Sequence, residues 1–209
     1  MLDGVQIYSR ALSSGEILAQ YNAGRGAYAV SGDGLIAQYT SNDYNATHVF
    51  DTNPVVLGHT QTDTDLTGRN FDGTDTSIKI DHTPFDDLND EQTISVWVKQ
   101  NNSIEPVNAG IVTKRSSGAF FGIYGSGNVN KFKIRLNDGK NNAESNNVSL
   151  TDITQWNNIT LVINGFNANG AKIYINGNYF GALSLSSFTT LINTNDLRFG
   201  KEGVSSKYF

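Results

Sequence analysis

The sequence predicts an all-β protein, a two-sheet antiparallel sandwich with one short helix near the N-terminus. Short runs of alternating apolar residues recur about every ten residues, which is the spacing expected of a β-sandwich. Asn176-Gly177 separates two such runs, and this dipeptide is the strongest short-range signal for a hairpin with a type I′ turn. No long stretch has the 3.6-residue period of a helix.

Strand-like runs follow one another along most of the chain. The clearest is 93–99, in which Ile94, Val96 and Val98 share one face; the opposite face carries Trp97, so we expect the strand to be covered on both sides. Residues 141–147 are polar and are predicted to form a loop. The other predicted strands are 34–39, 78–80, 111–114, 120–124, 131–136, 155–163, the hairpin 172–180, and 197–200.

The N-terminal residues predict a strand followed by the single helix. Val5 and Ile7 alternate with polar residues, as in a half-buried strand. Ser13 is followed three residues later by Glu16, which is the pattern of a capping box at a helix N-terminus. The glycines at 24 and 26 then predict the end of the helix and a linker.

Residues 3–21 resemble the closing strand and helix of laminin-G-like domains in the concanavalin A-like superfamily. The turn Phe71-Asp72-Gly73, the strand 93–99, the tryptophan-led strand 155–163 and the Asn-Gly hairpin resemble other landmarks of that family. The resemblance implies a jelly-roll sandwich with a rotated strand order, as in a circular permutant or a slice of a tandem array. It divides the chain into a closing strand and helix (1–22), a linker (23–33) and a jelly-roll body that lacks its last strand (34–209).

Residues 1–22 can complete either the chain's own sandwich or that of a neighbour. A sandwich without its last strand exposes a sheet edge that pairs readily with other chains. We favour completion within the chain or an array slice. If the segment is donated to the next molecule instead, the chain becomes a link in a strand-exchanged filament.

Composition excludes several function classes. The 209 residues include no cysteine and carry a net charge of −5, which argues against disulfide frameworks, thiolate metal sites and nucleic-acid binding. No apolar run reaches the roughly 18 residues needed to insert into a membrane. Asn, Thr, Ser, Asp and Gly dominate, as on extracellular surfaces, so we expect an extracellular or cell-surface protein.

A calcium ion (Ca²⁺) is the only cofactor that the sequence supports. Calcium needs six to eight oxygen ligands from loop carboxylates and carbonyls, and the resemblance points to Asp3 and Asp72, with Asp75 as a neighbour. The alternative is that Asp72 only caps its turn and Asp3 is solvated.

The sequence argues against an enzyme. Glucanases of this fold carry a Glu-x-Asp-x-x-Glu strand motif that places two carboxylates on one sheet face, and no such motif is present. The histidines at 48, 59 and 82 lack the His-Glu-x-x-His spacing of zinc hydrolases. We therefore expect a non-catalytic domain.

Sugar binding uses aromatic faces together with amide and carboxylate groups. The candidate ligand-binding residues are Tyr44, His48, Phe50 and Tyr124. For each of them, packing of a loop onto the sandwich is the alternative role, and Trp97 and Trp156 are expected to belong to the core. Lys131, Lys133 and Arg135 share one face of a predicted strand, which is either an ordinary solvated face or a row that holds an anionic polysaccharide.

We expect an adhesion or binding module for an extracellular glycan or other surface ligand, supported by calcium, within a repetitive surface or secreted protein. The alternative is a structural subunit of an extracellular filament, in which copies of the chain are joined by donated β-strands. Neither function involves membrane insertion.

Overall fold

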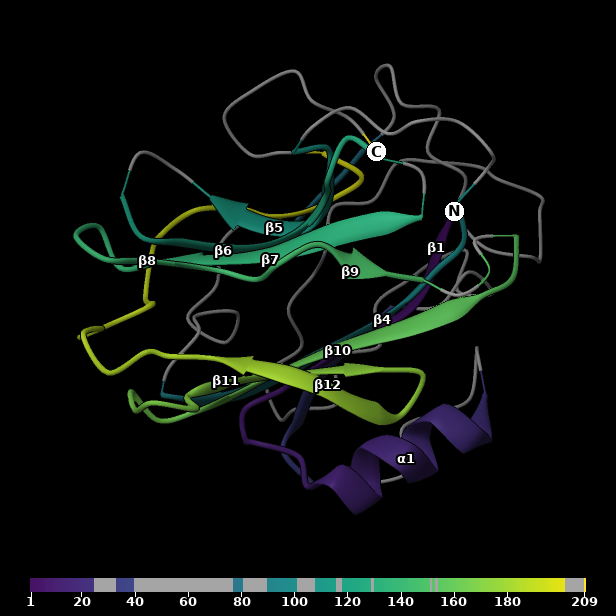
Figure 1. Cartoon of the computed structure of the whole chain (residues 1–209), viewed down its shortest axis with the longest axis horizontal. Coiled ribbons are helices and arrows are strands. Elements are labelled where there is room, and N and C mark those ends of the chain that lie inside the picture. Colours follow the sequence, from purple (N-terminus) through teal and green to yellow (C-terminus); the bar gives the residue numbers. More distant parts are fainter. Residues whose placement is uncertain are drawn as a thin grey trace.

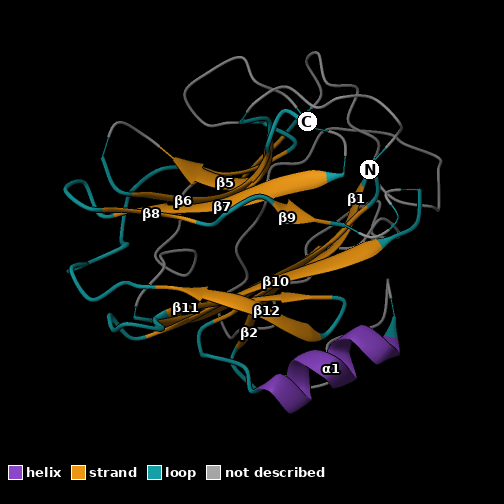
Figure 2. Cartoon of the chain, in the orientation of Figure 1, coloured by secondary structure: helices purple, strands orange, loops and turns teal. Residues whose placement is uncertain are grey.

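A computed structural model of the chain describes residues 1–24, 33–39, 77–80, 90–100, 108–115, 118–128, 130–150, 152, 154–201 and 209. Two antiparallel sheets lie face to face, and one helix lies below the lower sheet (Figures 1 and 2). The prediction of an all-β, two-sheet sandwich with one short helix is confirmed.

The lower sheet, sheet A, has the strand order β12-β11-β10-β4-β1-β2. Its strands are β1 (Leu2–Tyr8), β2 (Leu35–Tyr39), β4 (Glu91–Val98), β10 (Asn157–Asn164), β11 (Ala171–Ile175) and β12 (Asn178–Leu183). The predicted Asn-Gly hairpin joins β11 to β12, and Asn176 and Gly177 have φ of 50° and 76°. Both values are positive, as a type I′ turn requires.

The upper sheet, sheet B, has the order β3-β13-β5-β6-β7-β8, and β9 also pairs with β7. Its strands are β3 (Ile78–Ile80), β5 (Gly110–Arg115), β6 (Phe120–Gly125), β7 (Lys131–Asn137), β8 (Asn142–Glu144), β9 (Val148–Ser149) and β13 (Leu197–Phe199). The predicted loop at 141–147 was wrong in part, because β8 pairs with β7. An edge strand can form through backbone hydrogen bonds alone. The polar side chains of this segment therefore gave no apolar alternation from which a strand could be predicted.

The core lies between the two sheets. Ile94, Val96 and Val98 point into it from sheet A, and Ile134 and Leu136 point into it from sheet B. Along β7, buried and partly exposed residues alternate without exception, so each second side chain leaves the core and faces outward.

Strand β1 lies inside sheet A rather than at its edge. It pairs with β2 on one side and with β4 on the other, and all seven of its residues are buried. The slot for the closing strand is therefore filled from within the same chain in this structure. Both termini lie at the same end of the molecule (Figure 1), and the amide of Phe209 donates to the carbonyl oxygen of Gly200 at 2.9 Å.

Helix α1 (Ser14–Ala23) covers part of the outer face of sheet A. The predicted capping box is present: the amide of Glu16 donates to Ser13 Oγ, and the amide of Ser13 donates to Glu16 Oε2 at 2.8 Å. A second apolar cluster lies between helix and sheet, made of Tyr8, Leu12, Ile17, Leu35, Val162 and Tyr174. Trp97 stacks on Tyr21 of the helix, with ring centroids 5.5 Å apart. The predicted cover on both faces of the 93–99 strand thus comes from α1.

The helix is also anchored through polar contacts. The amide of Leu12 donates to Thr93 Oγ1 at 2.9 Å, and the hydroxyl of Tyr8 donates to Gln20 Oε1 at 3.4 Å. Burial raises the pKa of Tyr8 to about 12, so this hydroxyl remains a donor at neutral pH.

Candidate functional site

A pocket of about 410 Å³ opens on the outer face of sheet A, and it is lined by Asn164, Asn167, Asn169, Lys172, Tyr174 and Tyr179. These residues come from the end of β10, the following loop, and the β11–β12 hairpin. Pockets of about 300–1,000 Å³ with a few convergent polar groups are typical of small-ligand sites. The pocket is the candidate functional site.

The pleat of the sheet brings the pocket residues to one face. Val162 pairs with Lys172, and Thr160 pairs with Tyr174. Tyr174 pairs in turn with Tyr179 across the hairpin, and directly opposed residues in an antiparallel pair lie on the same face. The side chains of Lys172, Tyr174 and Tyr179 therefore line one surface, although they come from two strands.

The two tyrosines form an aromatic wall. Their ring centroids are 5.7 Å apart, in an edge-to-face arrangement with an interplanar angle of 70°. Tyr179 is 59% exposed, whereas Tyr174 is buried. Burial raises the pKa of Tyr174, and the neighbouring Tyr179 raises it further. Tyr174 therefore supports the exposed ring of Tyr179 and stays neutral.

The opposite side of the pocket is an asparagine loop held by its own hydrogen bonds. Asn167 Nδ2 donates to the carbonyl oxygen of Asn164 at 2.8 Å, and the amide of Asn169 donates to Asn167 Oδ1 at 2.9 Å. The amide of Leu185 donates to the carbonyl oxygen of Asn167 at 2.8 Å. These bonds fix the backbone of the loop beside the two tyrosines.

Helix α1 covers one part of the outer face of sheet A and leaves the part with the pocket uncovered. A Cβ atom on Gly177 would lie 3.0 Å from Leu18 Cδ1 and 3.2 Å from Tyr21 Cβ, so the helix rests directly on the hairpin turn. In Figure 1 the helix lies beneath the turn end of β11 and β12, and the other end of these strands remains uncovered. The outer face of sheet A is therefore divided into a helix-covered part and the open pocket.

Of the predicted ligand-binding residues, the structure describes only Tyr124, which does not line this pocket. Tyr44, His48 and Phe50 lie outside the described residues. Tyr124 is on β6 in the other sheet and has no exposed surface, so it does not provide an exposed platform for a sugar. Its ring lies against Gly122, where a Cβ atom would come within 2.4 Å of the ring.

The prediction for the two tryptophans holds only for Trp97. Trp97 is buried, whereas Trp156 is only partly buried and stands just before β10. Because the core-facing residues of this segment begin with Ile159, Trp156 precedes the part of the strand that the other sheet covers.

Of the predicted metal ligands, the structure describes only Asp3. It is buried, and its Oδ1 accepts a hydrogen bond from the amide of Gly4 at 2.7 Å. Asp72 and Asp75 lie outside the described residues. Within the described part of the chain, no three His, Cys, Asp or Glu side chains come together in a way that would hold a metal.

Sequence reasoning missed the pocket, although weak signals were present. Asparagines occur at 164, 167 and 169, and tyrosines stand on both sides of the Asn-Gly turn. Hairpin register places Tyr174 and Tyr179 opposite each other and was predictable from the turn type. The approach of the loop to the hairpin surface was not predictable from the sequence.

In the described residues, no helix is long and apolar enough to cross a membrane.

Comparison with known proteins identifies a family. Residues 72–209, about two thirds of the chain, match the laminin-G family described as the Concanavalin A-like lectin/glucanases superfamily. A search of curated proteins finds no significant match.

Two solved structures resemble part of the chain. The binding domain of Paraclostridial Mosquitocidal Protein 1 is 20% identical with a TM-score of 0.49, and the match covers 63% of this chain and 34% of that chain. Domain 4 of AbnA, a GH43 extracellular arabinanase from Geobacillus stearothermophilus solved with arabinotriose, is 11% identical with a TM-score of 0.49, and the match covers 63% of this chain and 61% of that one. Each match thus spans less than two thirds of the solved chain.

Proposed function

Because the chain belongs to the Concanavalin A-like lectin/glucanases superfamily, we propose that it is a non-catalytic binding module whose carbohydrate ligand occupies the pocket beside Tyr179. The observation that carries the proposal is the exposed Tyr179 ring facing a wall of asparagine amides and one lysine. The apolar face of a pyranose packs on an aromatic ring, and amides and ammonium groups address its hydroxyls.

The chemistry of the pocket favours binding over hydrolysis. Glycoside hydrolysis requires two carboxyl groups on either side of the scissile bond, and none of the described residues that line the pocket is an aspartate or glutamate. Lys172 and the asparagines donate and accept hydrogen bonds but supply no acid and base pair.

A glycan array with three proteins tests the proposal: the unaltered chain, Tyr179→Ala and Phe180→Ala. Phe180 is the matched control, because it is also exposed and lies on the same strand but does not line the pocket. We expect Tyr179→Ala to weaken binding about tenfold, which corresponds to about 1.4 kcal/mol, and Phe180→Ala to bind like the unaltered chain. An array without any bound glycan, or equal loss in both variants, contradicts the proposal.

Calcium support is a second part of the proposal. The carboxylates of Asp3, Asp72 and Asp75 are ligands of the type that calcium prefers, and a bound ion would stabilise the folded chain by mass action. We expect calcium to raise the thermal unfolding midpoint, and Asp3→Asn to reduce that shift. An unfolding midpoint that is the same with calcium and with chelator argues against calcium binding. The glycan proposal is tested separately, by the array.

We propose that the module acts outside the cell or at its surface, as its Asn-, Thr- and Ser-rich composition suggests. Antibody detection in fractionated source cells checks this location, and recovery of the protein only from the cytoplasm contradicts it.

A second candidate function is assembly into a filament by donated strands. It is favoured by one observation: β1 is held between β2 and β4, and β4 is not the neighbour of β1 in strand order along the chain. The same slot in another copy offers identical partners. Light-scattering mass over a range of concentrations tests this function. Polymers that grow with concentration support it, and a monomer at every concentration contradicts it.

A further inference from the structure

Asparagine is followed directly by glycine at three places in and beside the pocket, at Asn164, Asn169 and Asn176. Asn164 and Asn169 line the pocket, and Asn176 stands in the turn between β11 and β12. In an Asn-Gly pair the asparagine side chain reacts readily with the backbone, because glycine has no Cβ atom that hinders access to its amide nitrogen. The three pairs have the same local chemistry and differ in their tertiary contacts.

The reaction is an intramolecular deamidation. The glycine amide nitrogen attacks Cγ of the asparagine and forms a C–N bond. The side-chain nitrogen leaves as ammonia, together with the proton that the glycine nitrogen gives up. Water then opens the resulting succinimide ring at either of its two carbonyl carbons, which yields aspartate or isoaspartate. The reaction needs only water, but the side chain must be free to turn and the glycine nitrogen must leave its hydrogen bond.

Asn176 is held at both polar atoms of its side chain. Its Oδ1 accepts a hydrogen bond from the amide of Asn158 at 2.8 Å, and its Nδ2 donates to Asn157 Oδ1 at 3.0 Å. The turn also packs against α1, since a Cβ atom on Gly177 would lie 3.0 Å from Leu18 Cδ1. Because both hydrogen bonds must break before the glycine nitrogen can attack, the structure protects this site.

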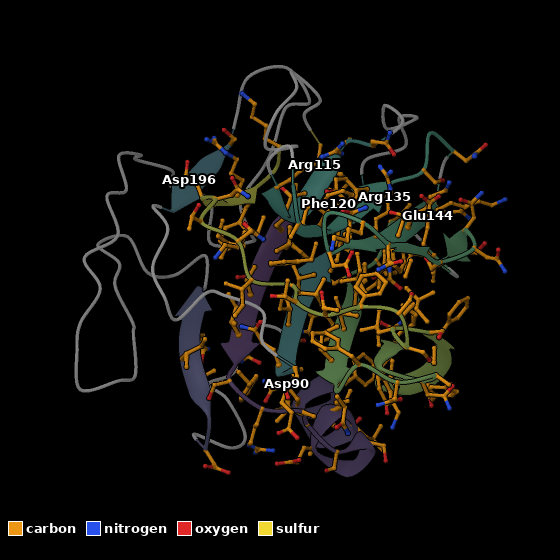
Figure 3. All side chains as sticks on the ribbon, turned by 90° about the vertical axis from the view of Figure 1, so that its left-hand side faces the viewer. Asp90, Arg115, Phe120, Arg135, Glu144 and Asp196 are labelled. Carbon is orange, nitrogen blue, oxygen red and sulfur yellow. The ribbon has the colours of Figure 1, made fainter. Side chains whose placement is uncertain are left out.

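Asn164 is restrained through the glycine that follows it. The amide of Gly165 donates to the carbonyl oxygen of Asp90 at 2.5 Å. Asp90 lies just before β4, on the sheet A side of the molecule (Figure 3). The bond therefore ties the loop to a distant segment of the chain, and the attacking nitrogen would have to give it up. The side chain of Asn164 is exposed, but its nucleophile is fixed.

Asn169 is the least restrained of the three. It is exposed, and among the described residues nothing forms a hydrogen bond with its side-chain amide. The amide of Gly170 donates to the carbonyl oxygen of Asn167 at 3.1 Å, which is a longer and more local bond than that of Gly165. The fold also requires glycine at 170, because a Cβ atom there would lie 2.3 Å from the carbonyl oxygen of Gly165.

We propose that Asn169 is a site of spontaneous deamidation, which converts it to aspartate or isoaspartate faster than Asn164 or Asn176 reacts. Lys172 is the one charged residue among the described residues that line the pocket, so the new carboxylate offsets its charge. Isoaspartate also adds a methylene group to the backbone of the loop, next to the hydrogen bond from the Asn169 amide to Asn167 Oδ1 at 2.9 Å. The modification therefore changes both the charge and the shape of the pocket as the protein ages.

Timed incubation of the folded chain at mildly alkaline pH tests the proposal. Peptide mapping with fragmentation spectra gives the deamidated fraction at each asparagine, and enzymatic methylation detects isoaspartate. We expect Asn169 to react at least about tenfold faster than Asn176 and faster than Asn164. The same chain unfolded in urea is the matched control, because the three pairs then lose their different contacts and are expected to react at similar rates.

The consequence for the pocket rests on the proposed function and has its own readout. Fresh and aged samples of each protein are compared on the glycan array, each with its own fresh sample as reference. We expect binding by the unaltered chain to change with age and binding by Asn169→Gln to stay constant, because the longer glutamine side chain forms the corresponding ring much more slowly. Equal change in both proteins contradicts this consequence.

Two results overturn the deamidation site itself. One is a rate at Asn169 in the folded chain that is no higher than the rate at Asn164 or Asn176. The other is no reaction at Asn169 in the folded chain under conditions in which the unfolded chain reacts. An array on which no glycan binds contradicts the proposed function alone, because peptide mapping measures the modification without a ligand.

Discussion

The outer faces of the two sheets differ in what covers them and in the chemistry that follows. On sheet A, α1 buries Tyr8, Val162 and Tyr174 beneath it, and the pocket occupies the part that the helix leaves open. On sheet B, the residues of β7 that leave the core are mainly charged, and arginines lie over Phe120. On sheet A the helix covers apolar residues beside the pocket, whereas on sheet B the guanidinium groups of Arg115 and Arg135 cover the aromatic rings.

This comparison predicts that substitutions on one face leave the structure of the other face unchanged. Changes to β1 or α1 are expected to disrupt sheet A and to lower the free energy of unfolding, and changes around Phe120 and Tyr124 are expected to disturb the packing of sheet B.

Deletion of residues 1–22 has the largest expected effect. Strand β1 pairs with two neighbours and is buried along its whole length, and α1 covers a second apolar cluster. We expect the shortened chain to lose its cooperative unfolding transition in circular dichroism. A folded, cooperatively melting product would mean that β1 is dispensable and that sheet A closes without it.

Gly122→Ala is expected to cost about 1–3 kcal/mol, as overpacking of a filled site does. The added Cβ atom would lie 2.4 Å from the Tyr124 ring, and Tyr124 has no free space because it is fully buried. Urea unfolding measures the change. Gly181→Ala on β12 is the control, since a Cβ atom there meets nothing within 4 Å. Equal stability of both variants would show that Tyr124 moves away freely.

Ser13→Ala removes the side-chain acceptor of the α1 capping box. Loss of such a cap costs about 1 kcal/mol. We expect this destabilisation in urea unfolding. An unfolding free energy equal to that of the unaltered chain would show that the capping box contributes nothing to stability.

The smallest effect concerns pH. The hydrogen bond from Arg10 lowers the pKa of Glu16 to about 2, with further contributions from Ser13. Because the folded pKa lies below the unfolded value near 4.5, this contribution is present above pH 4.5 and is lost as the pH falls toward 2. Glu16 is one third exposed, so solvent screening keeps the contribution below about 1 kcal/mol.

Glu16→Gln is therefore expected to lower stability at pH 6 and to unfold like the unaltered chain at pH 2. Urea midpoints at the two pH values check this. A constant difference between the two proteins at both pH values would assign the effect to packing instead of charge.

Local patterns by themselves determined the strand segments, the capping box and the Asn176-Gly177 hairpin. Alternation along 93–99 and 131–136 predicted which residues enter the core, since the side chains of a strand point to opposite faces in turn. The resemblance in residues 3–21 and 71–73 predicted the family. These features depend on contacts within a few residues, and they are readable from spacing alone.

Tertiary structure decided the features that depend on contacts between distant segments. The place of β1 between β2 and β4 arises from strand order, and the cover of Trp97 by Tyr21 arises from the packing of α1 on sheet A. The pocket exists because one loop is held beside the Tyr174 and Tyr179 pair. Residue spacing specifies which way a side chain points along its strand, but only the pairing of the strands specifies what stands opposite it.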